Sequence, residues 1–185
     1  TSTNSQARRS AQTALYHITH ALLRLMAPIL SFTAEEAWKD LHDGNALTIF
    51  TECYHVLPTQ DNANALTEKW ARLREIRAQA MRRIEDVRAT GKIGSSLAAE
   101  LDIYAQGSDL AFLRSLDDDL RFIMIVSRAS VHEGEGETRI EVIPTGHEKC
   151  ERCWHHRADV GHNADHPGLC GRCTSNLFET GESRH

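Results

Sequence analysis

Apolar residues recur at steps of three and four in two long stretches of the chain, a pattern that predicts two amphipathic helices. The first stretch covers residues 4–30, and its apolar face carries Leu15, Ile18, Leu22, Leu25, Met26 and Ile29. The second covers residues 66–90, with Trp70, Leu73, Ile76, Ala80, Ile84 and Val87 on one face. Gly91 follows the second stretch, where a helix commonly ends in a left-handed residue.

A shorter helix is predicted between these two. Pro28 should end or kink the first helix, and Thr33-Ala-Glu-Glu36 has the form of a capping box that opens a second helix through Leu41. Residues 46–63 show no periodicity and are predicted to form an irregular connection.

The pattern changes to alternation after residue 100. Residues 101–105 alternate like a strand, Ser108 could cap a short helix to Leu116, and residues 122–131 and 139–143 predict two more strands. This β-α-β-β order indicates a small α+β module. We therefore expect a mainly α-helical bundle portion over residues 1–92, an α+β module over 93–145, and a cysteine-rich knuckle over 146–185.

Four cysteines carry the strongest chemical signal in the chain. Cys150, Cys153, Cys170 and Cys173 form two C-x-x-C pairs with sixteen residues between them. This spacing matches a four-thiolate zinc site, in which each pair supplies two sulfurs to a tetrahedral shell. Such a shell is closed, so one Zn²⁺ per chain would stabilise the fold and leave no position for catalysis.

Two disulfides or a redox pair are the alternatives to zinc. Disulfides are disfavoured because no secretory segment precedes the cysteines and the fifth cysteine, Cys53, has no partner. A redox C-x-x-C normally opens a helix after a strand, and two matched pairs would be redundant. The spacing thus favours zinc.

Composition is that of a globular protein, with 41% apolar and 25% charged residues. No apolar run approaches the ~20 residues that span a bilayer, so we expect no membrane contact and a cytoplasmic location. The chain begins at Thr1 rather than Met, and we expect it to be a piece of a longer polypeptide. Its net charge of −5 argues against a polyanion contact over the whole surface.

The basic residues are nevertheless concentrated in one helix. Residues 66–92 carry eight Lys or Arg and four Asp or Glu. They could be a solvated face with internal salt bridges, which Glu85 and Asp86 support in part. They could also be a row of phosphate contacts. The candidates that lie away from obvious acidic partners are Arg74, Arg77 and Lys92.

The knuckle itself offers two further candidates for nucleic-acid binding. Trp154 directly follows Cys153 and could either cap the thiolates or stack on a base. Arg152, on the other side of Cys153, could supply phosphate or base-edge hydrogen bonds. His162 and His166 lie between the cysteine pairs and could replace a ligand, but four thiolates make that unnecessary, so both are predicted to be surface residues.

Several motifs taken together resemble a known family. Residues 8–17 (RRSAQTALYH) and 26–38 (MAPILSFTAEEAW) resemble the anticodon-binding helical domain of class I aminoacyl-tRNA synthetases of the Ile/Val/Leu group. Residues 91–99 (GKIGSSLAA), 119–127 (DLRFIMIVS) and 149–155 (KCERCWH), with 170–173 (CGRC), narrow this to the C-terminal part of the bacterial isoleucyl-tRNA synthetase family. The resemblance covers nearly the whole chain.

The resemblance implies a tRNA-binding, anticodon-reading segment of an isoleucine–tRNA ligase. In that family the ATP-dependent catalytic domain and the editing domain lie upstream, so this segment is expected to be non-catalytic, with no catalytic residues of its own. The expected partners are isoleucine-specific tRNA and the upstream domains. The positions that match the family's tRNA contacts are Arg152 and Trp154, and its zinc ligands match the four knuckle cysteines.

Two other functions use similar zinc modules. DNA glycosylases of the formamidopyrimidine type carry a four-cysteine finger at the same spacing, but they need an N-terminal Pro-Glu nucleophile, and this chain begins Thr1-Ser2. A zinc scaffold that binds protein is the other alternative, which the basic helix disfavours.

Overall fold

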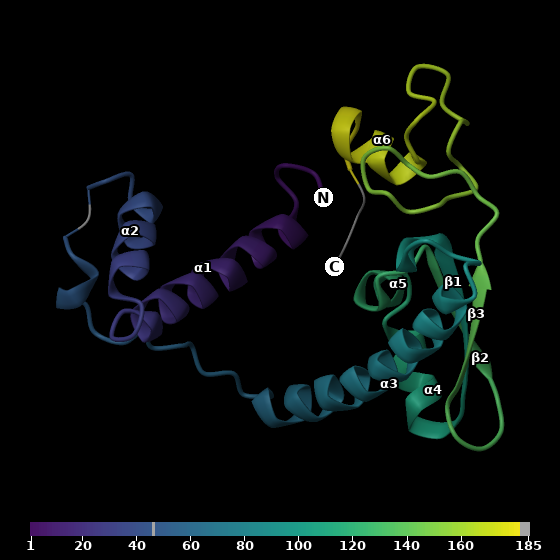
Figure 1. Ribbon diagram of the computed structural model, residues 1–185, viewed down its shortest axis with the longest axis horizontal. Helices are drawn as coiled ribbons and strands as arrows, with labels where there is room; N and C mark the ends of the chain where they lie inside the picture. The colour runs from purple at the N-terminus through teal and green to yellow at the C-terminus, as the bar shows by residue number, and fades with distance from the viewer. Residues whose placement is uncertain (46, 182–185) are drawn as a thin grey trace. The chain divides into compact units, whose positions relative to one another are not determined.

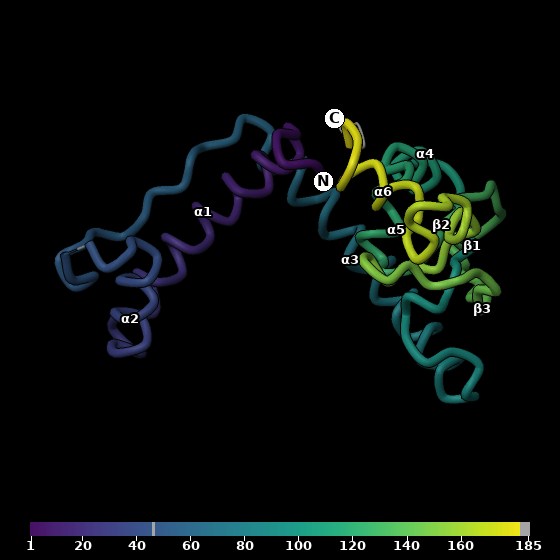
Figure 2. Tube along the Cα trace, turned by 90° about the horizontal axis from the view of Figure 1, so that it is seen from above, coloured from purple at the N-terminus to yellow at the C-terminus, as the bar shows by residue number. Residues whose placement is uncertain are grey.

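A computed structural model of the chain describes residues 1–45 and 47–181. Contacts divide the described chain into two compact units, residues 1–61 and residues 62–179. The elements and the sheet can be followed in Figure 1, and the same path is seen from above in Figure 2. No helix in the described part of the chain is both long and apolar enough to cross a membrane.

The first unit is built from two helices and a short 3₁₀ turn. Helix α1 spans Gln6–Met26, α2 spans Ser31–Leu41, and η1 spans Ile49–Thr51. Ser5 caps α1 by accepting a hydrogen bond from the Arg8 amide. The predicted long helix is confirmed, and it ends two residues before Pro28.

The predicted capping box at Thr33 is wrong. Helix α2 already begins at Ser31, and Thr33 lies inside it. Glu35, the residue before the capping-box glutamate Glu36, accepts hydrogen bonds from the Ile49 amide at 2.9 Å and the Thr48 hydroxyl at 3.0 Å. Its carboxylate therefore fixes η1 to α2, and these hydrogen bonds, led by the Ile49 amide, lower the pKa of Glu35.

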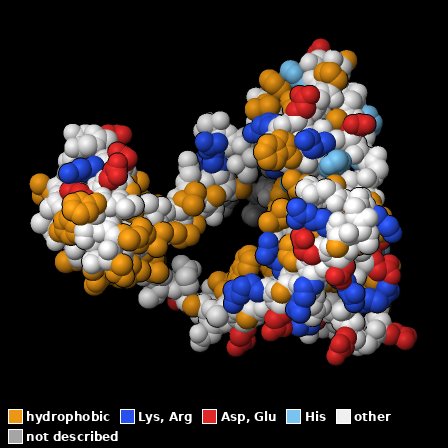
Figure 3. Space-filling model, in the orientation of Figure 1, with side chains coloured by type: hydrophobic (Ala, Val, Ile, Leu, Met, Phe, Trp, Pro, Cys, Tyr) orange, Lys and Arg blue, Asp and Glu red, His pale blue; other side chains and the backbone are white. Residues whose placement is uncertain are grey.

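The core of the first unit is small. It consists of Leu23, Ala27, Ala34, Trp38 and Ile49, and the Trp38 indole donates to the Leu47 carbonyl at 3.1 Å. Most of the predicted apolar face of α1 is exposed instead, including Leu15, Ile18, Leu22, Leu25 and Ile29. Hydrophobic side chains cover a large part of this unit's visible surface in Figure 3.

The second unit is an α+β module with a three-stranded sheet. Its elements are α3 (Ala63–Ala89), η2 (Ser96–Ala98), β1 (Ala99–Ala105), α4 (Gly107–Ser115), α5 (Asp119–Met124), β2 (Arg128–Glu133), β3 (Arg139–Pro144) and α6 (Gly171–Phe178). The strand order is β2-β1-β3, with β1 parallel to β2 and antiparallel to β3. The helix that ends near Gly91 is confirmed, and Gly91 has a φ of +74°.

One part of the predicted module is wrong. Residues 122–131 do not form a single strand, because α5 occupies Asp119–Met124 and the chain turns at Ile125, whose φ is +56°. Only then does β2 begin, at Arg128. The apolar run 122–126 thus divides between a helix and a turn, and the order is β-α-α-β-β.

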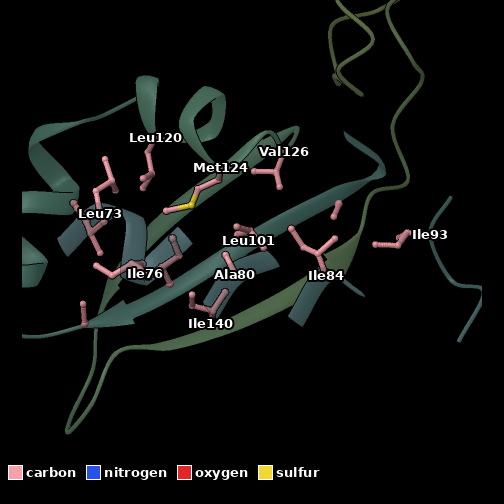
Figure 4. Packing of buried hydrophobic residues seen from close by; sticks show 14 residues of the cluster. Leu73, Ile76, Ala80, Ile84, Ile93, Leu101, Leu120, Met124, Val126 and Ile140 are labelled. Carbon is pink, nitrogen blue, oxygen red and sulfur yellow. The ribbon is translucent and has the colours of Figure 1, made fainter. Parts of the chain in front are cut away.

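Helix α3 packs on the sheet and supplies much of the core. Figure 4 shows Leu73, Ile76, Ala80 and Ile84 of α3 beside Leu101 of β1, and all of these residues belong to one buried cluster with Leu120, Met124 and Val126. Alternate residues of β1 face this core, as a half-buried strand requires. The division into segments 1–92, 93–145 and 146–185 stays a prediction about domains.

Candidate metal centre and nucleic-acid interface

The four knuckle cysteines converge in the structure. Their Sγ atoms lie within 4.8 Å of one another, and all four are free thiols rather than disulfides. The first pair lies in a turn closed by the Trp154 amide, which donates to the Cys150 carbonyl at 2.9 Å. The second pair is placed by α6, since Cys170 is its N-cap residue and Cys173 lies in its first turn.

The spacing of the sulfur atoms fits a tetrahedral zinc shell. With Zn–S bonds of ~2.3 Å, neighbouring sulfurs of a tetrahedron lie about 3.8 Å apart. Cys153 Sγ and Cys170 Sγ are separated by 3.8 Å. Cys150, Cys170 and Cys173 are fully buried, so the shell is also shielded from water. The cluster therefore fits one Zn²⁺.

The cluster can hold four charged thiolates together only when a cation is bound. The hydrogen bond that Cys170 shares with Cys153 raises the pKa of the Cys170 thiol and lowers that of Cys153, and burial raises the pKa of Cys173. Four crowded, buried thiolates would repel one another in the absence of a metal. A divalent ion removes that repulsion and deprotonates the thiols.

Two donors contact the sulfurs from outside the shell. The Cys170 amide lies 3.3 Å from Cys150 Sγ, and Arg152 Nη1 lies 3.6 Å from Cys173 Sγ. Hydrogen bonds of this kind orient metal ligands and offset their negative charge. Arg152, whose side chain is otherwise exposed, thus contacts the metal shell and reaches the surface.

Trp154 projects into solvent rather than covering the thiolates. It is 61% exposed, which favours the stacking alternative over the capping one. Its φ is +65°, a left-handed conformation that L-residues other than glycine adopt at a cost. The turn therefore holds a large aromatic side chain at a position where glycine would be less strained.

The structure separates the three basic candidates, of which Arg74 and Arg77 lie in α3 and Lys92 follows it. Arg74 and Lys92 are exposed, and within residues 1–45 and 47–181 neither forms an ion pair. Arg77 is half-buried, and its Nε donates to the Ile123 carbonyl at 2.9 Å. Arg77 consequently ties α3 to the end of α5.

Other arginines of α3 are paired, as the salt-bridge alternative expected. Arg83 Nη1 lies 4.0 Å from Asp86 Oδ2, and Arg88 Nη1 lies 3.4 Å from Glu85 Oε1. Arg72 bonds Asp109 of α4, and this hydrogen bond lowers the pKa of the Asp109 carboxyl. Only part of the basic helix is therefore free for a polyanion.

A junction between the knuckle and the α+β module was missed by sequence reasoning. The centroid of the Phe122 ring of α5 lies 5.3 Å from that of the His155 ring. The guanidinium carbon of Arg172, in α6, lies 4.7 Å from the centroid of the same Phe122 ring. The Ser127 hydroxyl donates to the Leu97 carbonyl and accepts from the His156 amide, both at 2.6 Å. These contacts hold His155 and His156 against α5 and the residue that precedes β2, and nothing in the sequence pattern marks them.

Comparison with known families agrees with this site. Residues 1–103 match the family described as "Anticodon-binding domain of tRNA ligase". Residues 148–176, which hold all four cysteines, match the family described as "Zinc finger found in FPG and IleRS".

Curated relatives carry one shared name. The chain is 62% identical over 192 residues to an isoleucine–tRNA ligase of Bordetella petrii, and 64% identical over 188 residues to that of Bordetella avium. It is 56% identical over 188 residues to the isoleucine–tRNA ligase of Cupriavidus taiwanensis. These alignments cover 97–100% of the chain but only 20% of each relative.

Proposed function

The chain belongs to the anticodon-binding family of tRNA ligases, and from that membership we propose that it is the tRNA-binding C-terminal portion of an isoleucine–tRNA ligase. The complete enzyme would join isoleucine to its tRNA with ATP, in the cytoplasm. This segment would contribute recognition and no catalytic residue. The chain spans about a fifth of the length of its relatives, so the reacting groups would come from the remainder of the polypeptide.

The observation that carries the proposal is the exposed ring of Trp154. Unstacked loop bases, such as those of an anticodon, are commonly held by aromatic stacking and by arginine. The ring is 61% exposed and the guanidinium of Arg152 is anchored to Cys173 Sγ. Both side chains flank the same ligand, Cys153, so little conformational freedom would be lost when RNA binds.

In this proposal zinc has a structural role. Cys150, Cys153, Cys170 and Cys173 would bind it, and the ion would supply the charge that keeps four thiolates together. Within the described part of the chain, the hydrophobic side chains besides cysteine that pack against the sulfurs are Val160 and Leu169, both partly buried. Such a segment needs metal to fold.

Phosphate contacts would come from α3 and from the residues that directly follow it. Arg74 and Lys92 are the proposed contacts because they are exposed and carry no ion pair among the described residues. Arg77 was a third candidate, but its hydrogen bond to the Ile123 carbonyl indicates that its main role is to hold α3 against the end of α5. Each phosphate contact would add to binding without reading sequence.

The first unit would be completed by the upstream part of the enzyme. The exposed apolar face of α1, with Leu15 60% and Leu25 61% exposed, is of the kind that marks an interaction surface. We propose that segment 1–92 belongs to a helical bundle whose other helices precede this chain. Segments 93–145 and 146–185 would be the junction module and the zinc module.

The glycosylase alternative is not favoured. More than half of the chain, residues 1–103, matches an anticodon-binding domain, which that function would not use. A scaffold that binds only protein would leave Arg74, Lys92 and Trp154 without a role.

Replacement of Trp154 tests the proposal. In the full-length enzyme, Trp154→Ala should leave isoleucyl-adenylate formation unchanged and weaken tRNA binding by about 1–3 kcal/mol, the value of one base stack. Zinc content should stay at one per chain. The control is His162→Ala, an exposed aromatic ring in the same module, which should change neither quantity. Unchanged tRNA affinity with zinc retained would overturn the stacking role, and loss of zinc would assign Trp154 to the metal site.

A further inference from the structure

The zinc module exposes a second aromatic ring that the anticodon-reading role of Trp154 does not use. Phe178, the last residue of α6, is 57% exposed. Its ring is stacked on the imidazole of His166, with centroids 3.9 Å apart and planes inclined by only 5°. His166 covers one face of the ring, and the exposed fraction of Phe178 leaves the other face open to solvent.

Both rings of this stack are fixed by the metal-binding turns. His166 lies four residues before Cys170, and its amide donates to the Asn163 side chain at 3.1 Å and the Asn163 carbonyl at 3.3 Å. Phe178 lies on the helix that begins at Cys170. The stack is thus held by the same scaffold that places Trp154.

The exposure of Phe178 is not what a small module would adopt for stability. The hydrophobic cluster of the knuckle contains four cysteines, Val160 and Leu169, and no aromatic residue. Complete burial of a Phe side chain stabilises a fold, and a segment with so small a core would benefit from it. A ring that is instead exposed and supported from behind is suited to a planar ligand.

On these grounds, and resting on the proposed function, we propose that the Phe178–His166 pair is a second stacking site for an unpaired nucleobase of the bound RNA. A base on the open face would extend the stack to three rings. Stacking of this kind is tolerant of sequence, because every base presents a flat aromatic face. The site would therefore add affinity and fix the path of the strand, while Trp154 and Arg152 act at a separate base.

The test uses the zinc-loaded chain, an isoleucine tRNA transcript, and a short single-stranded RNA carrying 2-aminopurine as a fluorescent base. Phe178→Leu keeps an apolar side chain but removes the flat ring, and should weaken tRNA binding by about 5- to 150-fold, the equivalent of one stack. Quenching of 2-aminopurine should fall with it. The slope of affinity against salt should not change, because stacking releases no counterions.

Two matched variants separate the stack from its surroundings. Leu177→Ala removes the neighbouring exposed side chain, which is 47% exposed and is not part of the stack, and should leave affinity within about twofold. His166→Ala leaves the Phe178 ring in place without its support, and should give a smaller loss than Phe178→Leu. Zinc content is measured for each variant, so that a loss of affinity is attributed to the ring only where the metal is retained.

The outcomes distinguish this inference from the proposed function. If Phe178→Leu binds tRNA as the wild type does while Trp154→Ala binds weakly, the second site is overturned and the proposed function stands. If Phe178→Leu in the full-length enzyme lowers adenylate formation but not tRNA affinity, the ring contacts protein and the inference is again overturned. If both Phe178→Leu and Trp154→Ala leave the tRNA affinity of the zinc-loaded full-length enzyme unchanged, both stacking roles are overturned.

Discussion

The left-handed backbone of Trp154 predicts that glycine at this position is more stabilising than alanine, the reverse of the usual order. Replacing an alanine by glycine normally destabilises a protein by about 0.4–1 kcal/mol, because glycine gains more freedom in the unfolded chain. At position 154 the φ of +65° reverses this order. We expect Trp154→Gly to be more stable than Trp154→Ala.

The size of the effect follows from the geometry. A side chain with a Cβ in the left-handed region costs about 1–2 kcal/mol, and glycine avoids that cost. After the usual stabilising effect of alanine is subtracted, the free energy of unfolding of the glycine variant should exceed that of the alanine variant by about 1 kcal/mol. Both variants lack the same ring, which is already 61% exposed in the wild type, so the burial that they give up is small and equal.

The assay compares the two variants in the zinc-loaded chain. Denaturant unfolding of the zinc module gives the difference in free energy, and metal analysis confirms that each variant holds one zinc. Their tRNA affinities should be reduced equally, since neither carries a ring. A glycine variant that is less stable than the alanine variant would refute the claim that this turn is strained, and unequal tRNA affinities would refute the claim that the ring alone binds the base.

Three further predictions test other parts of the structure. Removal of zinc by a chelator should abolish the structure of the knuckle while leaving the α-helical signal of the first unit, as followed by amide hydrogen exchange; a knuckle that stays protected would contradict the metal's structural role. Arg74→Glu should weaken binding to all RNAs and flatten the slope of log affinity against log salt concentration by about 0.7–0.9; equal slopes for this variant and the wild type would exclude a phosphate contact. Arg77→Met should instead lower the free energy of unfolding by about 1 kcal/mol, because it loses the hydrogen bond to the Ile123 carbonyl. Asp109→Asn should lower stability at pH 7 by about 1–2 kcal/mol, a range that allows for the partial exposure of Arg72. Because Arg72 lowers the pKa of Asp109 below its ordinary 3.8, this difference should persist above pH 3.8 and shrink as the pH falls below it; a difference that is constant down to pH 2 would exclude the carboxylate as its source.

The metal centre could be predicted from sequence because its geometry is local. Each C-x-x-C turn presents two sulfurs whatever the rest of the chain does. The structure brings the two turns together, with Cys153 Sγ of the first turn 3.8 Å from Cys170 Sγ of the second. The long helices were also predictable, because their apolar periodicity extends over many turns. Their ends could be placed from Pro28 and Gly91.

Short segments were less predictable. The apolar run at residues 122–126 is compatible with a strand or a buried helix, and periodicity alone cannot decide between them. Tertiary contacts decide it: Arg121 bonds Asp118 within the first turn of α5, and Leu120 and Met124 are buried in the main core. The capping box failed because α2 begins at Ser31, two residues before Thr33, with Leu30 as its N-cap residue.

The surface candidates depended on information that a sequence does not hold. Arg74 and Arg77 are alike in the sequence, yet only the docking of α5 against α3 makes the Ile123 carbonyl available to Arg77. The exposure of Trp154 likewise depends on how the knuckle packs on the sheet. Sequence could nominate these residues, and the structure was needed to rank them.

The most direct test of a tRNA-reading role is the affinity of the zinc-loaded chain for isoleucine tRNA, compared with the same tRNA in which the anticodon bases are replaced. We expect the natural tRNA to bind more tightly, by about 1–3 kcal/mol for each anticodon base that the protein holds, and the difference to disappear when zinc is removed. Equal affinity for the two tRNAs in the presence of zinc would contradict anticodon recognition by this chain.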